Sequence, residues 1–451
     1  MDLLSLNALV NRYVWGPEMM LVFLLVGLYL TVRSGFVQFA RIGVILRETL
    51  GAIRERALGA GGEITPFQAT MVALGATMGQ GNLIGVTAAL LAGGPGAIFW
   101  MWVAGIVGMA TKFAEATLAV HYRRRFADGS VSGGPMYYLS RGLPRGLAWL
   151  GGLYALLAAL AAFGIGNLTQ SSAMAASLKA AFAIPPGLTG LFVALVVAFI
   201  LGGGIRRIAG FAQTLVPLMV LVFLVAGVAE LVVYAGRLGG AVAAIFQGAF
   251  GAPAVAGGLG GYALAQALKA GVGRGIFSNE AGLGSAAIAH AQAQVDHPVR
   301  QGFWGVIEVF LDTLVVNTLM ALILLASGVL PQATGAAQAF VAAWNLPSGE
   351  AIAAVILALF VFTTLVSWGF YGEEAASFLL GEGIRWPYRI TYVVVAFVGA
   401  LGGFETVTAI ADTLNGLMAI PNLLGLLLLG GAVARLVRGF FRGEPWQPPQ
   451  G

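Results

Sequence analysis

Long apolar runs alternate with short, arginine-rich loops along almost the whole chain. A helix that crosses a bilayer needs about 20 predominantly apolar residues. Runs of this kind lie at residues 15–32, 66–93, 95–121, 147–182, 187–203, 209–235, 260–291, 300–328, 350–380, 387–403 and 405–434. The pattern therefore predicts an all-α integral membrane protein with about eleven transmembrane helices.

Composition excludes several other classes of protein. Ordinary soluble domains are about 45–50% apolar and about 25% charged, whereas this chain of 451 residues is 59% hydrophobic and 10% charged. The chain has no cysteine, which excludes a disulfide scaffold. The sequence pI of 9.6 reflects arginines in loops between spans, so nucleic acid is not an expected partner.

The arginines also predict the orientation in the membrane. One set of loops holds Arg33, Arg41, Arg47, Arg54, Arg56, Arg123, Arg124, Arg125, Arg141, Arg145, Arg206, Arg207, Arg300, Arg385, Arg389, Arg435, Arg438 and Arg442. The opposite loops hold only Arg12 and Arg237. Because basic residues stay on the cytoplasmic side, we expect the N-terminus outside and the C-terminus inside. A bacterial-type inner (plasma) membrane is the simplest location.

Two of the predicted spans are interrupted. Residues 75–82 contain three glycines, with Gln80 and Asn82 flanking Gly81 at mid-membrane depth. Glycines can serve close helix packing, but a lipid-facing helix would not hold both amides. The second interrupted span, 260–291, carries Gly271, Gly273, Arg274, Gly275, Ser278, Asn279, Glu280, Gly282, Gly284 and Ser285. Within it, Arg274 and Glu280 could form a pair, or each could lie near an unwound end.

Each interrupted span is the first of a group of five spans. Because five is an odd number, the second group is inserted with the opposite orientation. Two glycine-interrupted spans at matching positions of inverted halves indicate the binding site of a secondary transporter. We therefore predict an inverted 5+5 repeat of the leucine-transporter type plus one N-terminal helix, with two discontinuous helices. The expected parts are an N-terminal helix and linker (1–65), the first repeat (66–235), the inverted repeat (236–434) and a cytoplasmic tail (435–451).

The interruptions predict the chemistry of the site. Unwinding frees backbone N–H groups, which can hold a carboxylate, and carbonyl groups, which can hold an ammonium group or a small hard cation. Such a site suits a zwitterion and a coupling ion and needs no cofactor.

A sodium site is expected beside the first interruption. Thr363 and Thr364 lie on the third span of the second half, and they would contribute hydroxyl oxygens. Carbonyl oxygens of Gly75, Met78 and Phe360 would complete five ligands. Threonines in helices also commonly bond back to their own carbonyls, which is the structural alternative. Trp368, one turn beyond Thr364, would cap the substrate side chain.

The chain resembles the alanine or glycine:cation symporter family, also called the sodium:alanine symporters. The longest matching segments are 94–102, continuing through 108–113 with Glu115, and 274–282 with residues 284–286 and His290. Shorter ones are 133–138, 371–373, and Asp412 with Asn415 and residues 421–422.

This resemblance implies a leucine-transporter-type fold and uptake of a small neutral amino acid, alanine or glycine, coupled to sodium or sometimes protons. The Gln80 and Gly81 N–H groups would meet the carboxylate, and Thr77 and the Phe277 region would face the amino group. The full set of substrate-binding residues it implies is Thr77, Gly79, Gln80, Gly81, Phe277, Asn279, Thr364 and Trp368.

The remaining polar residues indicate structural roles, and several alternative functions stay open. Lys112 and Glu115 are expected to form a structural or gating ion pair rather than a proton relay. Asp312 with Asn317 and Thr318 could satisfy a broken helix end. The three histidines lack metal-ligand spacing, and no P-loop is present. A channel, a proton-coupled transporter and a glutamine-preferring transporter of the same fold remain alternatives, and an intramembrane enzyme lacks a recognisable nucleophile–base set.

Overall fold

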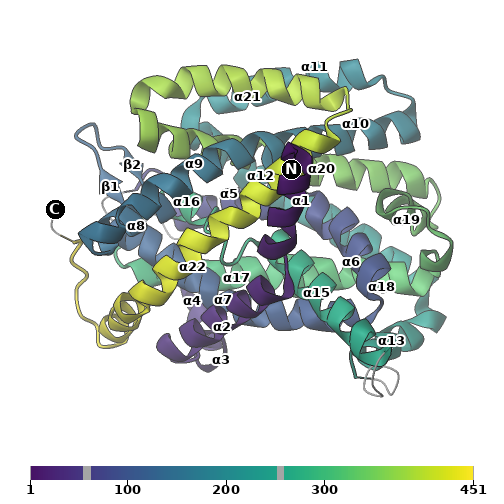
Figure 1. Ribbon diagram of the computed structural model, residues 1–451, viewed down its shortest axis with the longest axis horizontal. Coiled ribbons are helices and arrows are strands. Elements are labelled where there is room, and N and C mark those ends of the chain that lie inside the picture. Colours follow the sequence, from purple (N-terminus) through teal and green to yellow (C-terminus); the bar gives the residue numbers. More distant parts are fainter. Residues whose placement is uncertain (1, 54–61, 251–258, 450–451) are drawn as a thin grey trace.

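Helices make up almost all of the protein in the computed structural model, which describes residues 2–53, 62–250 and 259–449 (Figure 1). In the first half the helices are α1 Leu3–Val14, α2 Pro17–Arg33, α3 Val37–Ala40, α4 Ile42–Glu48, α5 Pro66–Thr77, α6 Val86–Gly93, α7 Gly96–Tyr122, α8 Pro135–Gly142, α9 Trp149–Phe163, α10 Thr169–Phe182, α11 Pro186–Gly202 and α12 Gly204–Val233. The second half holds α13 Leu238–Phe250, α15 Leu259–Asn279, α16 Ala287–His290, α17 Pro298–Val309, α18 Thr318–Ser327, α19 Ala336–Ala342, α20 Gly349–Leu380, α21 Arg385–Ala400 and α22 Glu405–Phe441.

Seven of the described helical segments are long and apolar enough to cross a membrane: Leu4–Arg33, Gly96–Tyr122, Arg145–Phe182, Gly204–Val233, Pro298–Ser327, Gly349–Leu380 and Glu405–Phe441. They coincide with seven of the predicted runs. The other four predicted runs contain the two interrupted spans and the shorter helices α11 and α21. The protein is therefore a multi-pass membrane protein, while the count of eleven spans stays a prediction.

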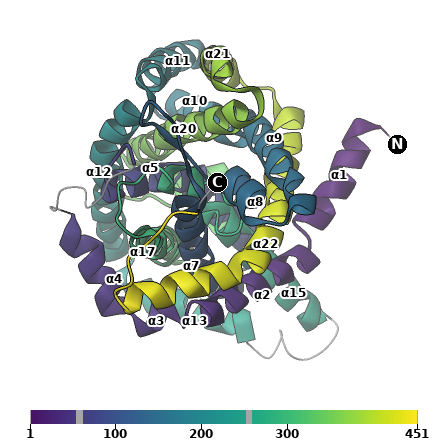
Figure 2. The ribbon, with the colours of Figure 1, turned by 90° about the vertical axis from the view of Figure 1, so that its left-hand side faces the viewer.

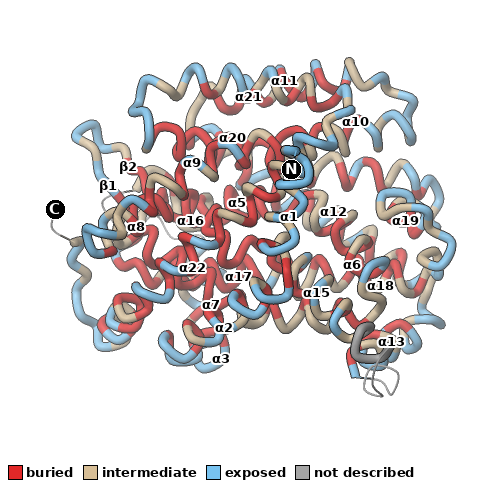
Figure 3. The backbone as a smooth tube through the Cα atoms, viewed as in Figure 1, coloured by how far each residue is buried: buried red, intermediate tan, exposed pale blue. Residues whose placement is uncertain are grey.

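The helices form a bundle around α5, α7 and α17, which lie at its centre when the molecule is seen end-on (Figure 2). The pair α11 and α21 lies at the periphery (Figure 2). Its outward side is exposed in Figure 3 and carries large apolar side chains such as Leu195 and Phe199, which are 63% and 68% exposed. A belt of this kind suits contact with lipid.

The first interrupted span breaks where the sequence predicts. Thr65 and Gln68 form a capping box and Pro66 occupies the first turn, so α5 begins sharply. Helix α5 ends at Thr77, and after residues 78–80 the chain resumes as a π-helical turn, Gly81–Gly85, that leads into α6.

The second interrupted span breaks at the C-terminal part of its predicted segment. Gly271, Gly273 and Gly275 are all helical, and α15 continues to Asn279. The break is the loop of residues 280–286, in which Glu280, Gly282 and Gly284 have positive φ angles of 55°, 98° and 82°. Glycine adopts such angles without strain, whereas Glu280 does not.

Some elements were not predicted. Helices α13 and α19 lie in loops between spans, and π-helical turns occupy Gly164–Leu168 and Phe310–Asn317. Strands β1 (Arg124–Arg125) and β2 (Val131–Ser132) form a short antiparallel hairpin. This hairpin, α8 and the C-terminus lie at one end of the molecule, and α13 and α19 lie at the other (Figure 1).

Candidate functional site

The break after α5 exposes carbonyl oxygens to a threonine of α20. In a continuous helix the Gly79 N–H would bond to the Gly75 carbonyl, but here it donates to Asn82 Oδ1 at 3.0 Å. Thr364 Oγ1 lies 3.1 Å from the Gly75 oxygen and 3.3 Å from the Met78 oxygen. These oxygens surround a buried point between the two helices.

Thr364 gathers most of the predicted sodium ligands. Its Oγ1 also lies 3.1 Å from the Phe360 carbonyl, and one hydroxyl proton can serve only one of three carbonyl oxygens. The remaining lone pairs are therefore available to a small cation. Thr363 lies on the same helix but shares only the Phe360 carbonyl with this group, at 2.9 Å, and its hydroxyl otherwise faces Met219 Sδ at 3.4 Å.

Gly79, in the break after α5, lies directly against this oxygen group. A Cβ atom there would lie 2.5 Å from Thr364 Oγ1 and 3.3 Å from Gln170 Oε1. A methyl group would therefore enter the space in which the predicted sodium ion would lie.

If the predicted sodium site lies here, the Gly79→Ala variant is expected to require about fivefold more sodium, because overpacking a tight site costs about 1 kcal/mol or more. Sodium titration of the expected amino-acid uptake measures it. Gly85→Ala is the matched control, since a Cβ there would meet only the Gln80 carbonyl, at 3.9 Å. Equal sodium titrations for the two variants would contradict the assignment.

A cavity of about 740 Å³ reaches the first break from the end of the molecule that carries α19. Gln80 lines its inner part, and the Gln80 N–H points to Gln170 Oε1 at 3.5 Å. Gln170, on α10, was not predicted, since a lone amide in a long apolar run gives no distinctive signal. A Cβ at Gly81 would lie 3.5 Å from the Phe277 ring, so these two predicted substrate residues are neighbours.

Phe277 and Arg274 line a second cavity. The Phe277 ring lies 6.0 Å from the Trp15 ring, centroid to centroid, and the Arg274 guanidinium lies 5.6 Å from the Phe277 centroid. Arg274 is exposed and lines a cavity with Asp412. Arg274 stacks on an aromatic ring and does not pair with Glu280. Glu280 instead lies at an unwound helix end, which was the other expected arrangement.

The other predicted substrate residues already have protein partners. Thr77 is buried and its hydroxyl contacts the Leu74 carbonyl at 3.3 Å. Asn279 donates to Thr313 Oγ1 at 3.0 Å and accepts from the Ala281 N–H at 2.9 Å. Both side chains therefore brace the breaks in this conformation.

Trp368 contacts the second break. Its Nε1 donates to Glu280 Oε1 at 3.1 Å, and its ring is buried. The predicted neighbour of the substrate side chain is thus hydrogen-bonded to the first residue of the unwound loop.

A buried amide network joins the two interrupted spans. Asn82 Nδ2 lies 2.6 Å from Asp312 Oδ1, 2.9 Å from Asn317 Oδ1 and 3.0 Å from Ser278 Oγ. Ser278 in turn donates to Asp312 Oδ2 at 2.9 Å. Asp312 therefore satisfies polar side chains that flank both breaks, from within a π-helical turn.

The predicted Lys112–Glu115 ion pair is wrong. Lys112 Nζ lies 3.4 Å from Glu308 Oε1 instead. Glu115 accepts from the Gly282 N–H at 2.9 Å and from Asn422 Nδ2 at 2.7 Å. The residues lie three apart on α7, but the break draws the Glu115 carboxyl to its backbone.

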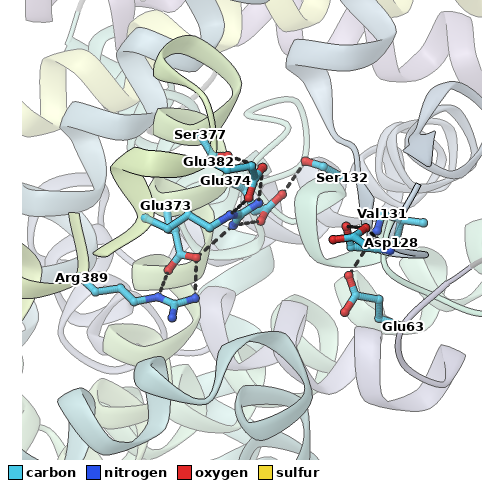
Figure 4. Close-up of polar contacts among 11 residues, drawn as sticks. Glu63, Asp128, Val131, Ser132, Glu373, Glu374, Ser377, Glu382 and Arg389 are labelled. Carbon is cyan, nitrogen blue, oxygen red and sulfur yellow. Dashed lines mark hydrogen bonds and ion pairs between the residues drawn. The ribbon is translucent and has the colours of Figure 1, made fainter. Parts of the chain in front are cut away.

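The end of the molecule opposite the cavity is held together by polar contacts, shown in Figure 4. We call this set the inner latch, because the arginine-rich loops around it predict that this end faces the cytoplasm. Its members are Glu63, Val131, Ser132, Glu373, Glu374, Arg385 and Arg389. Arg389 holds Glu373 with two bonds of 2.5 and 2.7 Å. Bidentate pairs of this kind are among the strongest polar contacts.

The inner latch joins the hairpin, α20, α21 and the segment that precedes α5. Ser132 of β2 hydrogen-bonds to Glu374 of α20, and the Val131 N–H donates to Glu63, just before α5, at 3.2 Å. At the rim, the hydrogen bond from Arg385 lowers the pKa of Glu382 and outweighs the opposite effect of partial burial. The carboxylate of Glu382 therefore stays ionised at neutral pH.

The comparison with known proteins decides the family. The chain matches the sodium:alanine symporter family over residues 2–446. It belongs to this family. The family consists of membrane symporters, so the protein is a transporter and not an enzyme.

Individual relatives agree with this membership. The sodium/alanine symporter AgcS of Methanococcus maripaludis is 44% identical over 451 residues, which cover 98% of each chain. A Bacillus subtilis relative named "Probable sodium/glutamine symporter GlnT" is 36% identical and covers 96% of this chain and 89% of its own. Among solved structures, MhsT in complex with L-phenylalanine superposes with a TM-score of 0.58, at 14% identity, over 84% of this chain and 99% of its own. This likeness gives the symporter a leucine-transporter-like fold.

Proposed function

We propose that this symporter imports a small neutral amino acid, alanine or glycine, together with sodium, by alternating access. The observation that carries the proposal is the set of oxygens around Thr364 beside a broken helix. Sodium would bind Gly75, Met78, Phe360 and Thr364, with Thr363 as a weaker fifth ligand. Oxygen-only sites of this kind suit a small hard cation.

The same proposal includes the architecture and orientation. Eleven spans, arranged as one N-terminal helix, a first repeat (66–235) and an inverted repeat (236–434), would place both breaks at mid-membrane. The arginine-rich end with the hairpin and the C-terminus would face the cytoplasm.

Access from one side supports alternating access. The cavity of about 740 Å³ leads to Gln80 at the end that would face outside, and the inner latch closes the other end. The described lining of this cavity includes Glu350 and Glu405 and no lysine or arginine. An acidic approach concentrates cations near the site.

The amino acid would bind between the two breaks. The Gln80 and Gly81 N–H groups would meet its carboxylate, and Thr77, Gly79 and the Phe277 region would lie around its amino group. Thr364, Trp368 and the Asn279 side chain would border the remainder. Since Asn279 and Trp368 have protein partners now, their substrate contacts would require a rearrangement on binding.

A glutamine-preferring transporter is the second candidate. The relative GlnT supports it, because its name gives glutamine as the substrate of a protein 36% identical to this one. Proton coupling in place of sodium coupling is a further variant of the same mechanism, and a channel would conduct without fixed coupling.

Uptake of labelled alanine, glycine and glutamine into proteoliposomes tests the proposal. We expect accumulation of alanine or glycine only with an inward sodium gradient. Preferred accumulation of glutamine would establish the second candidate. Uptake that responds to neither sodium nor pH gradients would rule out symport.

A further inference from the structure

Ionisable side chains gather around the second break, away from the proposed sodium site. They are Lys112 and Glu115 of α7, Glu280 of the break, His290 of α16 and Glu308 of α17, and all are buried. Such groups within a membrane protein are expensive and usually serve function.

The two basic side chains of this group, Lys112 and His290, both contact the carboxylate of Glu308. Glu308 receives Lys112 at 3.4 Å through one oxygen and His290 Nε2 at 2.7 Å through the other. His290 Nδ1 lies 2.7 Å from the side-chain amide of Gln301.

Charge balance then requires protons. With all three carboxyls ionised and Lys112 charged, the cluster would carry at least one uncompensated negative charge, whether or not His290 is protonated. Uncompensated buried charge is destabilising, and protonation removes it. A second sign of incomplete pairing is Glu115 Oε2, which is buried and has no hydrogen-bond partner among the described residues.

Glu280 is the carboxyl best placed to link a proton to transport. It begins the unwound loop with a left-handed backbone, and its partners, Trp368 Nε1 and the Ser285 hydroxyl, are both neutral. Protonation therefore breaks no ion pair at Glu280. It would, however, weaken the acceptor that holds the indole of Trp368.

We propose that the second break binds a proton on Glu280, with Glu115 as the neighbouring unpaired carboxyl, and that this proton is linked to amino-acid binding through Trp368. The inference rests on the proposed function only in placing Trp368 beside the substrate. The bound proton comes from water and converts the Glu280 carboxylate to the acid; no other bond is made or broken. The other titratable or hydrogen-bonding groups packed around the cluster are Tyr138 of α8, Tyr154 of α9, Tyr371 of α20 and Asn422 of α22.

Linkage makes the proposal measurable. If the proton favours the state that binds alanine, then alanine binding must favour proton uptake to the same extent. The limiting effect for one proton is about a tenfold change in the alanine Kd per pH unit.

The test is calorimetric titration of the purified full-length protein with alanine at saturating sodium, from about pH 5 to about pH 9. Repeating each titration in two buffers of different ionisation enthalpy counts the protons exchanged. For the native protein we expect proton uptake on binding and a pH-dependent Kd. For Glu280→Gln, which keeps an acceptor for Trp368, we expect both to disappear. Glu18→Gln, an exposed change on α2, should behave like the native protein.

Each outcome is decisive. A pH-independent Kd with no proton exchange in the native protein would overturn the proton site, and this measurement needs no variant. Dependence that persists in Glu280→Gln but vanishes in Glu115→Gln would overturn the assignment to Glu280. Absence of alanine binding at every pH would instead count against the proposed function.

Discussion

The Thr364→Val variant is expected to need a much higher sodium concentration for uptake while remaining folded. Valine matches the shape of threonine but removes the oxygen that lies within 3.1–3.3 Å of three carbonyl groups. Losing one polar contact to a charged group costs about 1.5–3 kcal/mol, which corresponds to about a 10- to 100-fold higher sodium requirement. Sodium titration of alanine uptake in proteoliposomes measures it.

Two further variants make this result specific. Thr363→Val should have a smaller effect, because Thr363 reaches only the Phe360 carbonyl of this group. Thr391→Val removes a similar bond from a threonine to its own helix, to the Pro387 carbonyl, on the exposed side of α21, and should change nothing. The sodium assignment would be wrong if Thr364→Val and Thr391→Val had the same sodium titration.

The second large effect is expected from Glu374→Ala, which cuts the inner latch. This change detaches α20 from Ser132 of the hairpin and removes a partner of Arg385. Loss of a charge-assisted hydrogen bond of about 1.5–3 kcal/mol should increase the inward-open population by about tenfold or more. Because the chain has no cysteine, a single Thr70→Cys label on α5 can report this opening by its rate of modification from the cytoplasmic side.

Glu382→Ala is the matched control for the latch. Glu382 also binds Arg385, but its side chain is 63% exposed and it makes no hydrogen bond to the hairpin within the described residues. Exposed ion pairs contribute little, so the labelling rate should stay near that of the native protein. Equal rates for the two variants would show that the latch does not hold the inner side closed.

The first break was predictable because its sequence is unsuited to any continuous lipid-facing helix. The second was predicted within residues 260–291 but not located more finely, because its glycines serve two purposes. Gly271 faces the Ala97 carbonyl and Trp100, and Gly275 faces Met101, with no space for a Cβ atom at Gly271. These glycines allow α15 to pack closely on α7, and the positive φ angles that produce the loop occur only from Glu280 onward.

Contacts between distant parts of the chain were beyond sequence reasoning. Glu374 and Ser132 are 242 residues apart, and Asn82 and Asp312 are 230 residues apart. Asp312 was recognised as a possible partner for a broken end, but its geometry depends on a π-helical turn that no local pattern announces. Lys112 was paired with its helical neighbour because spacing is all that a sequence offers, whereas the fold brings Glu308 closer.

The gap between Thr77 and Gly81 divides one membrane crossing into two short rods with no shared hydrogen-bond ladder. In a continuous helix, a tilt at one end would also move the other end. Here α5 follows Glu63, whose side chain accepts a hydrogen bond from the hairpin, whereas α6 packs against α7, α15 and α19. Each side of the transporter can therefore open by movement of a different half-helix, and the proposed substrate site lies at the bend between them.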